Sequence, residues 1–432
     1  MPATTSQDRA DAARALNKVL LHSRTTDQVL HRVKTPFARD LLFGSLRYYC
    51  TLSQTVNQQL DRALRSKDHD LWCLMIVGAY QLIHTRVPDH AAIHATVQAC
   101  NTLGKPWARG LLNGVLRSVQ RAPEQLFEPA DYYPAWFAEI IMADYPNQAR
   151  DLLAANLERA PQALRVNANR ISTAELAALL TERGIASKPG LVSGQLLLEE
   201  PISADQLPGF SEGLVTIQDA GAGFAPQLLA LQPGQRLLDT CAAPGGKLFH
   251  LLEVTPALGH AVAVESSPAR AQHLRDESAR LGHSPCIIEA DARDLAWWDG
   301  NLFDAILVDA PCSGSGTLRR HPEMKLLRTA EDIEGYQVLQ TALLESAWRT
   351  LRPGASLLYC TCSMFFAEND HVIGAFLAHT QDARNRPIVL PTGIATQHGW
   401  QLLPTDPRTD GFYYALLTKK GETNQGLRKQ PI

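Results

Sequence analysis

Three parts of different fold class are predicted along this 432-residue chain: a helical bundle, a small α+β unit and an α/β domain. Apolar residues recur at helical spacing through the first 122 residues. Strands and helices alternate from Pro226 onward, which is typical of a doubly wound parallel sheet. The length also exceeds that of one typical domain. We therefore expect a multi-domain protein with domains over 1–125, 126–220 and 221–420, and a frayed tail over 421–432.

The first part contains five stretches with a helical repeat of apolar residues. The stretch over 70–85 is strongly apolar, which predicts the central helix of a bundle, and Pro88 ends it. Short connections between the stretches favour a small bundle. The expected helices cover 7–24, 39–61, 70–85, 91–103 and 107–120.

Charge is distributed unevenly along the chain. Residues 1–122 hold 16 lysines and arginines against 8 aspartates and glutamates, whereas the whole chain has a net charge of −3. A basic first part indicates a polyanionic partner such as nucleic acid, although an ordinary solvated helical surface is the alternative. The sequence has neither a signal peptide pattern nor an apolar run of roughly 18 residues. We expect a cytoplasmic monomer with free cysteines and no membrane contact.

The middle part begins with a proline-containing connector and one short helix over 123–150. It continues as strand, helix, strand and strand. Ser172 and Glu175 have the spacing of a capping box, and Gly184 ends the helix that they begin. A small α+β unit that helps to position RNA is the expectation.

The α/β part places several polar side chains at the carboxyl ends of its strands. Open α/β sheets bind ligands at that edge. The strands are expected over 235–240, 260–266, 284–290, 303–310 and 355–362, with a terminal hairpin over 399–420. The acids that end four successive strands are Asp239, Glu265, Asp291 and Asp309.

The loop that follows the first of these strands predicts a cofactor site. It lacks the G-x-G-x-x-G spacing of a dinucleotide site, but Gly245 and Gly246 allow close approach to a ligand. The helix that follows favours a carboxylate at its N-terminus. Glu265 is suited to a ribose and Asp291 to an amino group, although either alone could be a helix cap. Several carboxylates together disfavour a ligand with a diphosphate group and suit one with a sulfonium cation and a ribose. The series therefore favours S-adenosylmethionine as the ligand.

Cys312 and Cys362 each lie just past a strand end. A lone cysteine there is usually a buried, inert side chain, and the alternative is nucleophilic catalysis on a pyrimidine. A thiolate that adds to C6 makes C5 able to attack a methyl sulfonium, after which a base removes the C5 proton. Asp309 meets the need for a group near the ring. Lys247 either adds positive charge to the pocket or is a solvated lysine at a helix start.

Four motifs resemble those of the Sun family of RNA 5-methylcytosine methyltransferases: DTCAAPGGK, LVDAPCSGSG, LRRHPEMK and YCTCSMFFAEN. In the first part, VPDHAAIHATVQAC and GLLNGVLRSV are similar to the NusB-type RNA-binding domain. The resemblance implies a Rossmann-like, S-adenosylmethionine-dependent enzyme acting on a cytosine of small-subunit (16S) ribosomal RNA. It also implies that Cys362 is the nucleophile, that Cys312 assists release of the methylated base, and that Asp309 contacts the cytosine.

The resemblance further implies which residues hold S-adenosylmethionine. They are Cys241, Ala242, Ala243, Pro244, Gly245, Gly246, Lys247, Glu265, Asp291 and Asp309. A metal site is not expected, because the Cys360-x-Cys362 pair lacks further ligands at suitable spacing.

Several arginines are candidates for contacts with RNA phosphates, with solvated ion pairs as the alternative. They are Arg39, Arg47, Arg109 and Arg117, together with the run Arg319-Arg320-His321 after the first cysteine loop. Two other functions compete with the methyltransferase. One is an RNA-binding assembly or antitermination factor with an idle enzyme domain, and the other is a nicotinamide-dependent oxidoreductase, which the missing glycine motif disfavours.

Overall fold

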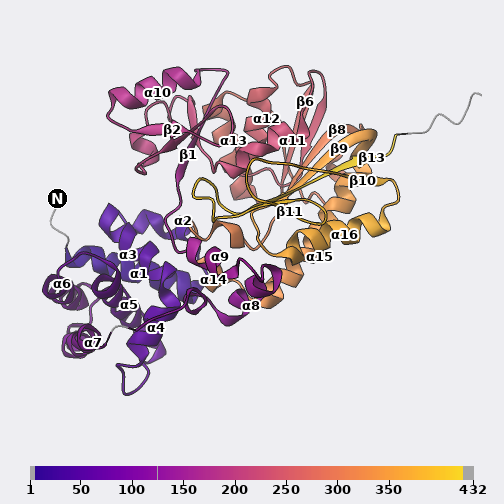
Figure 1. Cartoon of the computed structure of the whole chain (residues 1–432). Helices are drawn as coiled ribbons and strands as arrows, with labels where there is room; N and C mark the ends of the chain where they lie inside the picture. Colours follow the sequence, from indigo (N-terminus) through magenta and orange to yellow (C-terminus); the bar gives the residue numbers. More distant parts are fainter. Residues whose placement is uncertain (1–4, 124, 422–432) are drawn as a thin grey trace, which may run out of the picture. The chain divides into compact units, whose positions relative to one another are not determined.

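The computed structural model describes residues 5–123 and 125–421, which form two compact units (Figure 1). The first unit is built from residues within 1–159 and 317–330, and the second from residues within 160–316 and 331–432. Except for Gly421, the tail that is predicted to fray lies outside the described residues. None of the helices in the described ranges is long and apolar enough to cross a bilayer.

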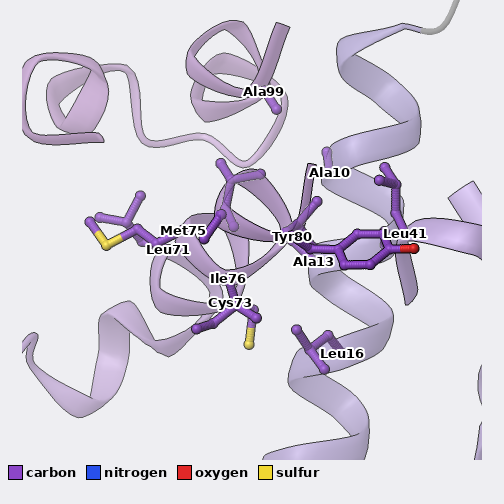
Figure 2. Packing of buried hydrophobic residues seen from close by; sticks show 14 of the residues in the cluster. Ala10, Ala13, Leu16, Leu41, Leu71, Cys73, Met75, Ile76, Tyr80 and Ala99 are labelled. Atoms are coloured by element: carbon purple, nitrogen blue, oxygen red, sulfur yellow. The ribbon is translucent and has the colours of Figure 1, made fainter. Parts of the chain in front are cut away.

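The first unit is helical, as predicted. Its bundle consists of α1 (Ser6–His22), α3 (Pro36–Arg47), α4 (Tyr49–Asn57), α5 (His69–His84), α6 (Asp89–Thr102) and α7 (Arg109–Arg121). Helix α5 contacts each of the other five, because nearly all of its middle residues are apolar and buried. Figure 2 shows side chains of α5 together with Ala13 and Leu16 of α1 in this core. Residues 1–159 of this unit also include three further helices: α2 (Thr26–Val29), α8 (Ala135–Asp144) and α9 (Ala149–Ala155).

The single helix expected over 39–61 is wrong. The chain leaves helical geometry at Tyr48, where φ is −104° and ψ is 13°, and this residue separates α3 from α4. The ring of Tyr48 stacks on that of His84, with centroids 3.9 Å apart. This contact joins α5 to a residue that is distant in sequence. The apolar repeat over 39–61 is a local pattern and could not predict it.

The segment 317–330 belongs to the helical unit, although it follows the cysteine loop in the sequence. It includes the short helix α14 (Met324–Leu327). Glu323, which is fully buried, accepts hydrogen bonds from the backbone N–H and the hydroxyl of Thr26 at 3.0 and 2.7 Å. Lys325 donates to the carbonyl oxygens of Arg47 and Tyr132 at 2.6 Å each. These bonds fasten the segment to α2 and to the end of α3.

The second unit begins with a four-stranded antiparallel sheet in the order β2-β3-β1-β4. Its strands are β1 (Gln162–Val166), β2 (Ser187–Pro189), β3 (Gln195–Leu198) and β4 (Val215–Ile217). Helix α10 (Thr173–Glu182) starts with the predicted capping box, in which Ser172 and Glu175 bind each other's backbone N–H. The predicted α+β unit is therefore confirmed.

A nine-stranded sheet forms the rest of this unit, in the order β11-β12-β13-β9-β8-β5-β6-β7 with β10 beside β13. The predicted parallel strands are β5 (Arg236–Asp239), β6 (His260–Glu265), β7 (Cys286–Glu289), β8 (Phe303–Asp309) and β9 (Leu351–Thr361). The other four are antiparallel: β10 (Ala383–Arg386), β11 (Ile394–Ala395), β12 (Trp400–Leu402) and β13 (Phe412–Lys419). The sheet is thus mixed, since the predicted terminal hairpin pairs with β9.

Helices cover both faces of this sheet (Figure 1). Side chains alternate between the faces, so that Leu237 packs with α12 (Gly246–Val254) and α13 (Pro268–Leu281), whereas Leu238 packs with α15 (Ala330–Thr350) and α16 (Asp370–His379). Helix α11 (Ala225–Leu229) joins the first of these layers. Burial on both faces explains why β8 reads as a continuous apolar run.

Candidate active site

The candidate site lies at the carboxyl ends of β5, β8 and β9. Strand β8 pairs in parallel with β5 on one side and with β9 on the other, so the three ends meet at one edge. Asp309 ends β8, and Cys362 directly follows β9. The Ala310 N–H donates to the carbonyl of Cys360, which keeps the loop after β8 against the end of β9.

The two predicted catalytic cysteines are in contact. Their Sγ atoms are 3.4 Å apart, and both residues are half-buried. The hydrogen bond from Cys312 lowers the pKa of the Cys362 thiol, and the positive charge of Lys247 acts in the same direction. The same hydrogen bond, together with burial, raises the pKa of Cys312. The two thiols therefore differ, and Cys362 gives up its proton more readily than Cys312.

Lys247 and Asp309 form an ion pair in the site. The Nζ atom is 2.8 Å from each carboxylate oxygen, and the Lys247 side chain is 8% exposed against 32% for Asp309. Burial disfavours the Lys247 ammonium, but the Asp309 charge more than compensates and raises the lysine pKa. Cys360 also donates its S–H to Asp309, at 3.4 Å. Lys247 is thus a buried cation of the site and not a solvated helix-start residue.

The loop between β5 and α12 has a backbone that only glycine fits at one position. Gly245 has φ of 100°, and a Cβ there would lie 2.2 Å from Cε2 of Phe249. Asp239 accepts a hydrogen bond from the Cys241 N–H at 3.2 Å. Burial, followed by the charge of Asp309, raises the pKa of Asp239 to about 8. Asp239 therefore shapes the loop and carries little charge near neutral pH.

Two of the acids predicted to bind the cofactor lie at the ends of the neighbouring strands β6 and β7: Glu265 is the last residue of β6, and Asp291 lies two residues after β7. Glu265 is buried and accepts a hydrogen bond from the Ser267 N–H at 2.9 Å. Asp291 is more exposed, and both of its oxygens accept hydrogen bonds from Arg293, which lowers the pKa of Asp291. A ligand amino group would share this carboxylate with Arg293.

A buried polar cluster behind the cysteines was not predicted. Glu368 is fully buried and binds Ser313 and Ser363, the residues that directly follow the two cysteines. Asn369 donates to the Ser363 carbonyl at 2.9 Å. The sequence contained a signal for this cluster, because Glu368 and Asn369 stand in an otherwise apolar stretch after Cys362. Polar residues that are buried in such a stretch need hydrogen-bond partners.

The arginines proposed to contact RNA differ in exposure. Arg39, Arg109 and Arg117 are exposed. Arg47 is buried, and its guanidinium donates to the carbonyl of Arg319 at 2.9 Å, so it is structural. Arg319 is only 4% exposed, which disfavours the predicted contact with a phosphate.

Known proteins match each part of the chain. Residues 226–418 match the family described as 16S rRNA methyltransferase RsmB/F, residues 4–121 the NusB family, and residues 133–205 the ferredoxin-like domain of RsmF/B-like methyltransferases. Ribosomal RNA small subunit methyltransferase B of Pseudomonas syringae pv. tomato is 42% identical over 402 residues, which cover 90% of each chain.

Solved structures share the fold. The crystal structure of PH0851 superimposes with a TM-score of 0.84, at 23% identity, over 97% of this chain and 100% of that one. NSun6 from Pyrococcus horikoshii, solved with SFG, has a TM-score of 0.60 at 20% identity and covers 66% of this chain and 98% of its own. The identity and coverage of the Pseudomonas relative, with matches to all three parts, show that the chain belongs to the 16S rRNA methyltransferase RsmB/F family.

Proposed function

We propose that the chain transfers a methyl group from S-adenosylmethionine to C5 of a cytosine in 16S ribosomal RNA. Family membership supports an enzyme that methylates ribosomal RNA. The observation that carries the finer proposal is the contact between Cys312 and Cys362, with Sγ atoms 3.4 Å apart. Methyl transfer to a nitrogen or oxygen needs no protein nucleophile, whereas C5 of a pyrimidine must first be activated by addition at C6.

In this proposal the two thiols have different tasks. Cys362 has the lowered pKa and supplies the thiolate that bonds to C6 of the base. Cys312 assists release of the methylated base: the C5 proton passes to a base, the C5–C6 double bond re-forms, and Cys362 leaves C6 as a thiolate. Asp309 contacts the ring from the end of β8, and Lys247 holds that carboxylate in place. The target base leaves its stack to reach the cysteines.

The residues around the β5–α12 loop fit S-adenosylmethionine, which supplies the methyl group when bound. A Cβ at Gly245 would lie 2.2 Å from Cε2 of Phe249, so the loop presents only backbone at this position. Glu265 offers a carboxylate to ribose hydroxyls, and Asp291 offers one to the amino group. The loop from Cys241 to Gly246 would lie along the ligand, whose positive sulfonium suits the neighbouring carboxylates.

Two single substitutions test the roles of the thiols. Cys362→Ala should abolish transfer of tritiated methyl groups to 16S ribosomal RNA, because no thiolate can add to C6. Cys312→Ala should accumulate a covalent protein–RNA adduct, seen as a slowly migrating band in a denaturing gel. Cys286→Ala changes an exposed thiol on β7 and serves as the matched control. Normal turnover by Cys312→Ala, or transfer by Cys362→Ala, would overturn the assignment.

A further inference from the structure

The buried side chain of Glu368 accepts hydrogen bonds from residues of both cysteine loops. It takes bonds from the Ser313 N–H at 2.7 Å and from the Ser313 hydroxyl at 2.5 Å. It also takes one from the Ser363 hydroxyl at 2.5 Å. Ser313 directly follows Cys312 and Ser363 directly follows Cys362, so each serine that binds the carboxylate is one residue away from a thiol along the chain.

The environment of Glu368 makes these bonds obligatory. The residue has no exposed surface. A buried carboxylate without hydrogen-bond donors is strongly disfavoured, and so is a buried N–H without an acceptor. The side chain of Gln340, on α15, donates a further hydrogen bond to Glu368 at 3.3 Å. The group is therefore held from three elements and has little freedom to move.

Backbone hydrogen bonds fasten both ends of the Cys312 loop. The Ala310 N–H binds the carbonyl of Cys360, and the Gly316 N–H binds the carbonyl of Cys362, each at 2.9 Å. These bonds anchor the start of the loop to β9 and its end to Cys362, which directly follows β9. Between them, the Ser313 N–H has Glu368 as its acceptor, and Cys312 is its neighbour.

We propose that Glu368 is a positioning residue that holds the Cys312 and Cys362 thiols at a separation at which both reach one pyrimidine ring. It acts through Ser313 and Ser363 and does not touch the base. The catalytic consequence rests on the proposed function, but the effect on the distance between the thiols does not. Asn369 provides a contrast, since its bonds support the Cys362 side alone.

A thiol–disulfide equilibrium measures this positioning without RNA or cofactor. Oxidised glutathione takes two electrons from the two thiols, which release their protons and form an S–S bond while two molecules of glutathione leave. The amount of the Cys312–Cys362 cross-linked peptide at defined glutathione ratios gives the effective concentration of one thiol near the other. Mass spectrometry on the full chain separates this pair from the other cysteines.

Glu368→Gln keeps the shape but replaces an acceptor oxygen with an N–H₂ group that faces donors. We expect the effective concentration of the thiols to fall about tenfold or more, the effect of losing one buried hydrogen bond. In RNA methylation, kcat should fall by a similar factor with little change in KM for RNA. Glu345→Gln, the same change at an exposed position of α15, should alter neither quantity. Effective concentration and kcat like those of the unmodified chain would overturn the proposal.

Ser313→Ala guards against a variant that does not fold, because it removes only the hydroxyl bond to Glu368 and keeps the bond from the backbone N–H. It should lower the effective concentration by a smaller factor, and an unchanged value would also count against positioning. The two proposals fail separately. If the unmodified chain transfers no methyl group but Glu368→Gln still separates the thiols, only the proposed function is lost.

Discussion

The Nζ atom of Lys247 lies 2.8 Å from both carboxylate oxygens of Asp309. This ion pair joins the first turn of α12, which follows the candidate cofactor loop, to the end of β8, which precedes the Cys312 loop. One buried cation thus connects the two halves of the proposed site. Its charge also favours the thiolate of Cys362.

Lys247→Met should raise the pKa of Cys362. The substitution removes a positive charge that lowers this pKa and leaves the Asp309 carboxylate, which raises it. The pH midpoint of Cys362 alkylation by iodoacetamide, followed by mass spectrometry, should therefore move upward by about one unit. Lys247→Arg keeps the charge and should move the midpoint much less. An unchanged midpoint in Lys247→Met would show that Lys247 does not influence the thiol.

Gly245→Ala should destabilise the second unit and weaken cofactor binding. The new Cβ would lie 2.2 Å from Cε2 of Phe249 and 2.7 Å from Cδ1 of Leu274, at a residue with φ of 100°. Strain of this kind costs about 1–3 kcal/mol. Gly246→Ala is the control for stability, because its Cβ meets only Nε2 of Gln218 at 3.4 Å. Thermal unfolding and calorimetric titration with S-adenosylmethionine would measure both effects, and equal stability of the two variants would contradict the expectation.

Local patterns predicted the strands and the acids that end them, because both depend on short stretches of sequence. The apolar run of β8 and the alternation of strands with helices placed Asp309 and the two cysteines at one edge of the sheet. The contact between Cys312 and Cys362 follows from the pairing of β8 with β9. Such features need no knowledge of individual side-chain partners.

Contacts between residues distant in sequence could not be predicted in this way. The break at Tyr48 accompanies stacking on His84, and the burial of Arg47 and Arg319 comes from docking of the segment 317–330. The clamp at Glu368 has the same origin, since Ser313 is 55 positions away. Each depends on which surfaces meet after the chain has folded, and residue spacing does not record that.

Arg165→Met should strongly destabilise the second unit. Arg165 on β1 forms two hydrogen bonds of 2.8 Å with Glu253 on α12, and each side chain is 1% exposed. Removal of one partner leaves an uncompensated buried charge, which costs about 3–5 kcal/mol. The double variant Arg165→Met/Glu253→Met should recover much of this loss, because neither charge remains. Urea unfolding would measure the unmodified chain, the single variants Arg165→Met and Glu253→Met and the double variant, and additive losses in the double variant would exclude the ion pair as the cause.

Lys325 should make the stability of the helical unit depend on pH. Burial lowers the pKa of this lysine to about 7, whereas an unfolded lysine has a pKa of about 10.4. Between these values the unfolded chain binds a proton that the folded chain does not. The free energy of unfolding should therefore rise with pH in this window, by up to about 1.4 kcal/mol per unit, and lose this contribution as pH falls through 7.

Lys325→Met removes this contribution, so the difference in stability between the unmodified chain and the variant should grow in favour of the unmodified chain from pH 7 to pH 9. Urea unfolding at several pH values, read by pulsed hydrogen exchange in peptides from α3 and α5, follows the helical unit separately. Lys34→Met, at an exposed position, should leave the slope unchanged. Parallel curves for the unmodified chain and Lys325→Met would mean that Lys325 keeps its proton throughout this range. The hydrogen bonds to Arg47 and Tyr132 would then outweigh its burial.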